Sequence, residues 1–292
     1  LHQRRDILSS SIDAQTDEIG FTSGGTESNN LALFGVLRAN RLKKYLIVGS
    51  VEHHSVLRAA RALEREGYSL TVLPCDADGR YSPEALARAL RADTALVSLQ
   101  IANNETGVLQ PIAEIGSVTR AKRIPLHCDA VAAYGHIPLD VGALRIDLMS
   151  VSAHKTGGPR GAGFLFVRNV IPLIPLFFGG SQERALRPGT ENLPAVVGFA
   201  KALECTGIPS PSAVRDRLQA LLTRRFPGCR INGLSAPRLP HILSASLPGV
   251  PAEWLLSRLS AAEIYVSARA ACAGGDRAPS HVLTAMGLDE AQ

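Results

Sequence analysis

The sequence predicts an α/β fold built on a mostly parallel sheet with helices on both faces. Strand-like and helix-like segments alternate from about residue 17 to residue 170, which is typical of a parallel sheet. After residue 200 a polar, proline-rich passage introduces a different pattern. The chain has 292 residues, 46% of them hydrophobic, enough for a large core. We expect a large domain over residues 1–204 and a smaller α+β domain over residues 205–292.

The elements of the large domain follow from apolar runs and helix start signals. Strands are expected at residues 19–22, 45–48, 69–73, 95–100, 124–129 and 146–151. Helices are expected at residues 25–36, 55–66, 83–92 and 112–120, with Ser82 as cap and Pro83 in the first helical position of the third. The apolar window 161–180 contains Arg168, Pro172 and Pro175, so it indicates a core strand and a loop rather than a membrane helix.

In the smaller domain we expect a helix at 213–226, a strand at 242–247, a helix at 252–259 and a loop around Cys272. Neither internal repeats nor low-complexity tracts occur in the sequence.

Composition excludes several functional classes. The net charge is +5, but the basic residues are scattered and form no run interleaved with aromatics, so nucleic-acid binding is not expected. The cysteine count is odd, five, and no CxxC motif occurs, which argues against a disulfide framework or a zinc site. The first residues do not form a signal peptide. A reducing compartment, the cytoplasm, is therefore expected.

Lys155 is the most informative residue. It follows the apolar run 146–151 and lies between a histidine and a glycine pair. A lysine in an apolar setting loses its proton easily, because burial disfavours the charged form, and a neutral amine can form a Schiff base. The alternative is a strand-end lysine that extends to solvent.

Asp129 ends another strand-like segment. Neighbouring strands that end together would place Asp129 and Lys155 at one edge of the sheet, where open α/β folds bind ligands. A carboxylate and an amine there suit pyridoxal phosphate (PLP), whose ring nitrogen pairs with an aspartate and whose aldehyde reacts with a lysine. The alternative is an aspartate that caps a helix.

Three further strand ends carry polar residues. The Gly24-Gly25-Thr26 turn opens a helix, so its free N–H groups can hold a phosphate. His53 can stack on an aromatic cofactor, or simply start a helix facing water. The amides of Asn103 and Asn104 can reach a ring hydroxyl or a substrate carboxylate, or simply form a turn.

Cys272 lies in a glycine-bearing loop with Arg269 nearby. An exposed cysteine near positive charge can be a nucleophile; the alternative is an incidental free thiol. Cys128, by contrast, lies within a strand-like run and is expected to be buried and inert.

Together these residues resemble the cysteine desulfurases of the NifS/IscS kind, within the class V aminotransferase family of PLP enzymes. The similarity extends from about Phe21 to Leu288. The matching segments are residues 21–28, Glu52-His53, residues 103–107, Asp129, residues 152–155, residues 180–184, residues 187–190 and Ala271-Cys272.

The resemblance implies a fold-type-I PLP enzyme with a seven-stranded sheet. Lys155 would bind the cofactor as a Schiff base, Asp129 would pair with its ring nitrogen and His53 would stack on the ring. Asn104 would lie near the ring oxygen. The phosphate would be held by Gly25, Thr26, Ser152 and His154, and Thr190 would reach the phosphate of a partner subunit, which implies a homodimer.

The resemblance also implies a reaction. L-cysteine would be converted to L-alanine, and its sulfur would pass to Cys272 as a persulfide and then to an acceptor protein such as an iron–sulfur scaffold. No resident metal is expected, although Cys272 could be a transient ligand of an iron–sulfur cluster.

This chain also differs from the family pattern. Ala132 occupies a position that is usually glutamine, and Ala268-Arg269-Ala270-Ala271 precedes the cysteine in place of Ser-Gly-Ser-Ala. The first strand and helices of the family and its carboxylate-binding arginine near the end are not matched. Two alternatives therefore stay open: a truncated, weakly active PLP-binding homologue that acts as a partner-binding subunit, and a selenocysteine-lyase-like enzyme.

Overall fold

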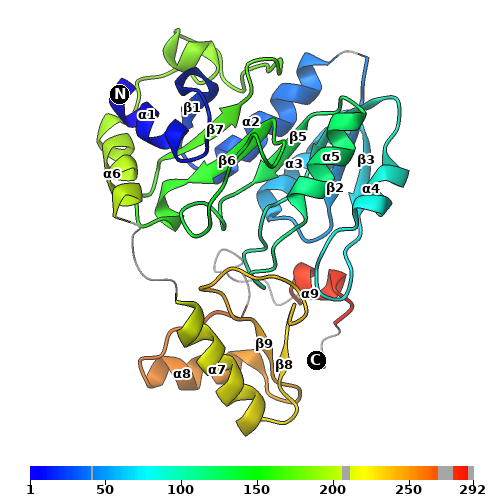
Figure 1. Cartoon of the computed structure of the whole chain (residues 1–292), viewed down its shortest axis with the longest axis vertical. Coiled ribbons are helices and arrows are strands. Elements are labelled where there is room, and N and C mark those ends of the chain that lie inside the picture. Colours follow the sequence, from blue (N-terminus) through cyan, green and yellow to red (C-terminus); the bar gives the residue numbers. More distant parts are fainter. Residues whose placement is uncertain (41, 206–210, 269–278, 289–292) are drawn as a thin grey trace.

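The structure is a computed structural model that describes residues 1–40, 42–205, 211–268 and 279–288. At its centre is a seven-stranded sheet with the strand order β1-β7-β6-β5-β4-β2-β3 (Figure 1). The strands are β1 (Ile19–Thr22), β2 (Tyr45–Gly49), β3 (Ser69–Leu73), β4 (Thr94–Ser98), β5 (Leu126–Asp129), β6 (Leu148–Ser152) and β7 (Gly163–Val167).

Strand direction confirms the mostly parallel sheet. Strands β2 to β6 pair in parallel, whereas β7 pairs antiparallel with both β6 and β1. Strand β7 reverses because it is joined to β6 by a short connection without a long helix, and a short connection between neighbouring strands favours an antiparallel pair. Since β1 is antiparallel to β7, it runs in the same direction as β6.

Helices cover both faces of this sheet and enclose two separate apolar cores. Helices α2 (Gly25–Ala39) and α3 (His54–Arg65) pack over one face, with Val36 and Leu63 in that core. The other core contains side chains of α1 (His2–Ser10), α4 (Pro83–Ala89), α5 (Ile112–Ala121) and α6 (Leu193–Glu204). No helix in the described part of the chain is long and apolar enough to cross a membrane.

A smaller lobe lies below the sheet in Figure 1. It contains α7 (Ser212–Arg225), the hairpin of β8 (Arg230–Ile231) and β9 (Ala245–Ser246), and α8 (Ala252–Ala261). Helix α9 (His281–Ala285) returns to the large sheet at the junction of the two lobes. The domain limits at residues 204 and 205 stay a prediction.

Element ends differ from the predicted ones for local reasons. The helix expected at 83–92 ends at Ala89, because Leu90 has an extended backbone. The strand expected at 124–129 begins at Leu126, since Pro125 has no N–H to donate to the ladder. The strand expected at 242–247 is only the two-residue β9.

A buried ion pair fixes the start of the chain to the sheet. Glu183, in the one-turn helix η3 (Gln182–Ala185), accepts hydrogen bonds from Arg5 at 2.6 and 2.7 Å and from the Phe21 amide at 2.8 Å. The Glu183 side chain is only 1% exposed. The same arginine donates to the Ile19 carbonyl, so one carboxylate joins α1, β1 and the loop that leads to Thr190.

We expect Glu183→Ala to lower the free energy of unfolding by about 3–5 kcal/mol, because it leaves the Arg5 guanidinium without its buried partner. The matched control is Glu204→Ala, whose pairs with Lys201 and Arg4 are exposed to solvent and predict no measurable loss. Urea unfolding of both variants measures the difference. Equal losses would contradict the anchoring role of Glu183.

Candidate active site

Six strands, β1 to β6, end at one edge of the sheet, and five of them carry a predicted site residue. Strands β1, β2, β4, β5 and β6 run in the same direction, so the loops after their carboxyl ends emerge together, where α/β sheets bind ligands. The sequence-predicted residues lie just after those ends: Thr26 after β1, His53 after β2, Asn104 after β4, Asp129 at the end of β5 and Lys155 after β6.

Asp129 supplies a buried negative charge. The residue is 6% exposed, and its side chain accepts hydrogen bonds from Asn29 Nδ2 at 2.7 Å and from the Val131 amide at 2.9 Å. Burial raises the pKa of Asp129, while these hydrogen bonds and nearby His53 act in the opposite direction. Within the described residues Asp129 has no ion pair with a lysine or arginine, although buried charges are normally paired.

A chain of hydrogen bonds joins Asp129 to His53. Asn29 Nδ2 also donates to Ser55 Oγ at 2.8 Å, and that hydroxyl lies 2.8 Å from His53 Nδ1. The Ser55 amide donates to His53 Nδ1, so the neutral ring carries its proton on Nε2. His53 therefore also caps α3. It starts a helix, as the alternative interpretation expected, and the same hydrogen bonds fix the orientation of its ring.

Asn29 and Ser55 were not recognised from the sequence. Asn29 lies on α2 and is buried at 1% exposure among apolar residues such as Leu33. The sequence signal for Asn29 is a polar side chain on the apolar face of a helix. Such a buried group must have a hydrogen-bond partner, which indicates a contact with another polar residue.

The turn after β1 approaches β6 closely. Gly24 has φ +145°, and a Cβ there would lie 3.4 Å from Ser152 Oγ. A Cβ on Gly25 would lie 2.5 Å from Val131 Cγ2, so no side chain fits. Ser152 is buried, and its hydroxyl lies 2.8 Å from His154 Nδ1. The two glycines, the exposed Thr26 and this Ser–His pair thus form a narrow polar cradle at the start of α2.

Lys155 ends the one-turn helix η2 (Ala153–Lys155). The expectation that its amine lies in an apolar setting is wrong: the side chain is exposed, because η2 extends beyond the sheet edge. Strands β5 and β6 are neighbours, with Asp129 opposite Ser150. The predicted juxtaposition of the two strand ends is therefore present.

The two asparagines after β4 have different surroundings. Asn103 is buried; it donates to the Val51 carbonyl and accepts from the amides of Glu105 and Thr106. The Asn103 side-chain amide therefore stabilises the turn, as the alternative interpretation expected, and does not face a ligand. Asn104 is half-buried and is the asparagine left to face a ligand.

Glu52, next to His53, is fully buried. Its Oε1 accepts hydrogen bonds from Tyr81 and from the Gln100 amide, each at 2.9 Å. Burial raises the pKa of Glu52 well above its ordinary value, and Asp129 nearby raises it further. Burial thus favours the neutral form of Glu52, whereas nearby His53 and two hydrogen bonds favour the charged form of Asp129.

The remaining predicted residues lie outside this cluster or outside the described part. Thr190 is exposed, in a loop held against the α2 start by an Arg187–Glu27 ion pair at 2.9 Å. Cys272 lies outside the described residues. Ala132 is half-buried and packs against the core, so it offers no donor.

The four described cysteines form no disulfide with one another. Cys128 is buried, as expected, and burial raises the pKa of its thiol well above the ordinary value. Cys75, Cys128, Cys205 and Cys229 are free thiols. Within the described ranges no three His, Cys, Asp or Glu side chains gather as metal ligands.

The geometry fits PLP. Asp129 is a buried carboxylate without a lysine or arginine partner among the described residues, and a pyridinium would supply that partner. The Gly24–Gly25 cradle lies at the start of α2, where a helix can hold a phosphate. Lys155 provides the amine and His53 a ring of fixed orientation. Fold and site together define a PLP-dependent enzyme of fold type I.

The family follows from comparison with known proteins. The aminotransferase class-V family model matches residues 1–288, and the chain belongs to this family, whose cofactor is PLP. A relative is cysteine desulfurase IscS of Methanosarcina thermophila, 44% identical over 285 residues, which cover 95% of this chain and 70% of the relative.

Solved structures agree with this assignment. A NifS-like protein superposes with a TM-score of 0.90 at 34% identity, covering 99% of this chain and 78% of its own. SspA in complex with cysteine gives a TM-score of 0.88 at 34% identity, covering 99% and 83%. The fold predicted from the sequence is thereby confirmed.

We expect Gly25→Ala to weaken PLP binding and to lower the free energy of unfolding by about 1–3 kcal/mol, because the new methyl overlaps Val131. Gly228→Ala is the control, since a Cβ there meets nothing within 4 Å. Titration with PLP, followed by visible absorption, and thermal unfolding measure both effects. If the Gly25→Ala variant binds PLP as tightly as the control does, Gly25 is not part of the phosphate-binding site.

Proposed function

We propose that this protein is a PLP-dependent cysteine desulfurase that converts L-cysteine to L-alanine. The observation that carries the proposal is the buried Asp129 beside the strand that leads to Lys155, at an edge shared with His53 and the glycine cradle. The names of its relatives, among them cysteine desulfurase IscS of Methanosarcina thermophila, support this substrate.

Each residue in the cluster has a proposed task. PLP, when bound, supplies an electron sink for bond cleavage at the amino acid. Asp129 keeps the ring nitrogen protonated, and its partner Asn29 fixes the carboxylate. His53 covers one face of the ring. Gly25, Thr26, Ser152 and His154 hold the phosphate, while Asn104 faces the ring oxygen and the substrate.

Lys155 and Cys272 are the proposed catalytic residues. Lys155 binds the cofactor and, once the substrate displaces it, takes the Cα proton of cysteine. The Cys272 thiolate then attacks the substrate sulfur, so that the carbon–sulfur bond breaks as a sulfur–sulfur bond forms. Cysteine and the enzyme thiol thus give alanine and an enzyme persulfide, and no external oxidant is needed.

The position of α9 supports the task of Cys272. Ser280, the α9 cap, donates to Glu105 Oε2 at 2.5 Å, and His281 Nε2 donates to the Glu52 carbonyl at 2.9 Å. The chain is therefore fixed beside His53 and Asn104 eight residues after Cys272. This attachment, eight residues further along the sequence than Cys272, supports the task proposed for that cysteine.

We further propose a homodimer in which Thr190 reaches the partner's phosphate, and a sulfur-acceptor protein, such as an iron–sulfur scaffold, that takes the persulfide. Exposed apolar side chains near the Thr190 loop support the dimer: Phe177 is 56% exposed and Phe178 is 83% exposed. Such exposure on a soluble domain favours a protein contact.

Purified protein with PLP is expected to show a visible absorption band that Lys155→Ala removes, because no other amine would lie next to Asp129. Adding L-cysteine to the unmodified protein should shift the band and release alanine. The control is Lys201→Ala, an exposed lysine paired with Glu204. A band that persists in Lys155→Ala would assign the cofactor to another residue.

Cys272→Ala is expected to keep the visible band and to lower cysteine-dependent sulfide release at least a hundredfold, because the sulfur has no acceptor. Cys205→Ala, which removes an exposed thiol outside the proposed site, should leave the release unchanged. Sulfide and alanine are measured together. Undiminished release in Cys272→Ala would instead favour a selenocysteine-lyase-like enzyme, in which this thiol is dispensable.

A further inference from the structure

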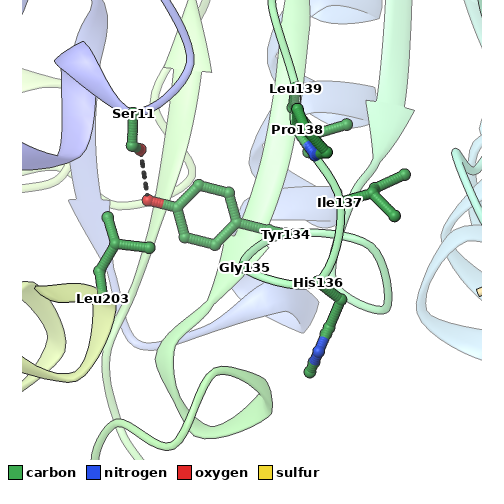
Figure 2. A pocket seen from close by; sticks show the side chains of 8 residues that line it. All are labelled: Ser11, Tyr134, Gly135, His136, Ile137, Pro138, Leu139 and Leu203. Atoms are coloured by element: carbon green, nitrogen blue, oxygen red, sulfur yellow. Dashed lines mark hydrogen bonds between the residues drawn. The ribbon is translucent and has the colours of Figure 1, made fainter. Parts of the chain in front are cut away.

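A histidine outside the predicted site contacts the backbone of Lys155. His136 Nε2 lies 3.0 Å from the Lys155 carbonyl oxygen. A carbonyl only accepts, so Nε2 carries the proton and donates. The turn that carries His136 also lines a hollow of about 290 Å³ together with Tyr134 (Figure 2). His136 thus ties the turn after β5 to the turn that carries the proposed Schiff-base lysine.

A second histidine, from the smaller lobe, packs against the first with its ring tilted. The ring centroids of His136 and His241 are 3.9 Å apart, with 31° between the ring planes. The segment before His241 is fixed to the turn after β4: the Leu109 amide donates to the Pro237 carbonyl and the Leu239 amide to the Gly107 carbonyl, each at 2.8 Å. One short segment therefore contacts both the Asn104 turn and His136.

We propose that His136 and His241 act as a pair that positions Lys155: His136 holds the Lys155 carbonyl, and His241 holds the His136 ring in that orientation. The proposal rests on the proposed function only in taking Lys155 as the residue that binds PLP. His136 and His241 are positioning residues, because neither is placed in contact with the substrate or the cofactor.

The pair is stable only while it carries little charge. Partial burial, together with His136 and Lys155, lowers the pKa of His241 to about 4. A lowered pKa means that the stacked state binds protons less readily than the separated state, whose histidine titrates near pH 6.5. The stack is thus fully stable above about pH 6.5 and is progressively weakened as the pH falls toward about 4.

Other charged groups lie near this segment. Arg215 donates to the Leu239 carbonyl and pairs with Asp216, and Arg238 donates to Gln219. The charged groups that act on His241 itself are His136 and Lys155, both on the large lobe. Protonation of His241 therefore places a positive charge opposite a second histidine and a lysine and favours separation of the rings.

The test is the rate at which PLP becomes trapped on Lys155 by borohydride, with the modified lysine identified by peptide mass. His136→Phe removes the donor and is expected to slow trapping about tenfold at neutral pH. His136→Gln retains an N–H donor and should restore the rate to within about twofold. His2→Phe, an exposed histidine on α1, is the matched control.

His241→Phe tests the pH dependence, because phenylalanine stacks but cannot titrate. The rate ratio between about pH 7.5 and about pH 5 should fall several-fold relative to the unmodified protein. Equal trapping in His136→Phe and His136→Gln, or an unchanged ratio in His241→Phe, would overturn the positioning role alone. Trapping of PLP on a lysine other than Lys155 in the unmodified protein would overturn the proposed function as well.

Discussion

The common direction of five strands is the constraint on which this site depends. Because β1, β2, β4, β5 and β6 all end at one edge, every loop that carries a polar residue emerges there, whatever its distance along the sequence. The reversed β7 lies between β1 and β6 and keeps β1 in that direction. Because β7 is antiparallel to both of its neighbours, β1 and β6 end at the same edge, which places the glycine cradle on the edge that carries Asp129.

The surroundings of the two buried carboxylates, Glu52 and Asp129, differ in which protonation state they favour. Glu52 and Asp129 are both buried, but Glu52 accepts from a tyrosine hydroxyl and one amide, whereas Asp129 accepts from Asn29 and the Val131 amide and lies near His53. Burial of both charges without a cation would be costly. Burial favours the neutral form of Glu52, while nearby His53 and two hydrogen bonds favour the charged form of Asp129, so Asp129 is the carboxylate that suits a cationic ring nitrogen.

The sequence was sufficient for the sheet and for the residues at its strand ends, because apolar runs fix strands and parallel strands must end together. It was insufficient for partners that approach from distant segments. Nothing local indicates that Asn29 meets Asp129, or that His241 of the small lobe stacks on His136. The exposure of Lys155 was also missed, since strand burial says little about a turn that leaves the sheet.

The small lobe matters because it is attached to the large sheet around the site. Its segment at residues 237–242 is hydrogen-bonded to the turn that carries Asn104 and contacts His136. Helix α9 and its cap are hydrogen-bonded to Glu105 and Glu52. Helices α7 and α8 bury no residue. The lobe is instead fixed to the sheet by these hydrogen bonds and by Leu239 and Val282, which are buried in the large apolar core. Any movement of the lobe must therefore act first on the residues beside Lys155 and His53.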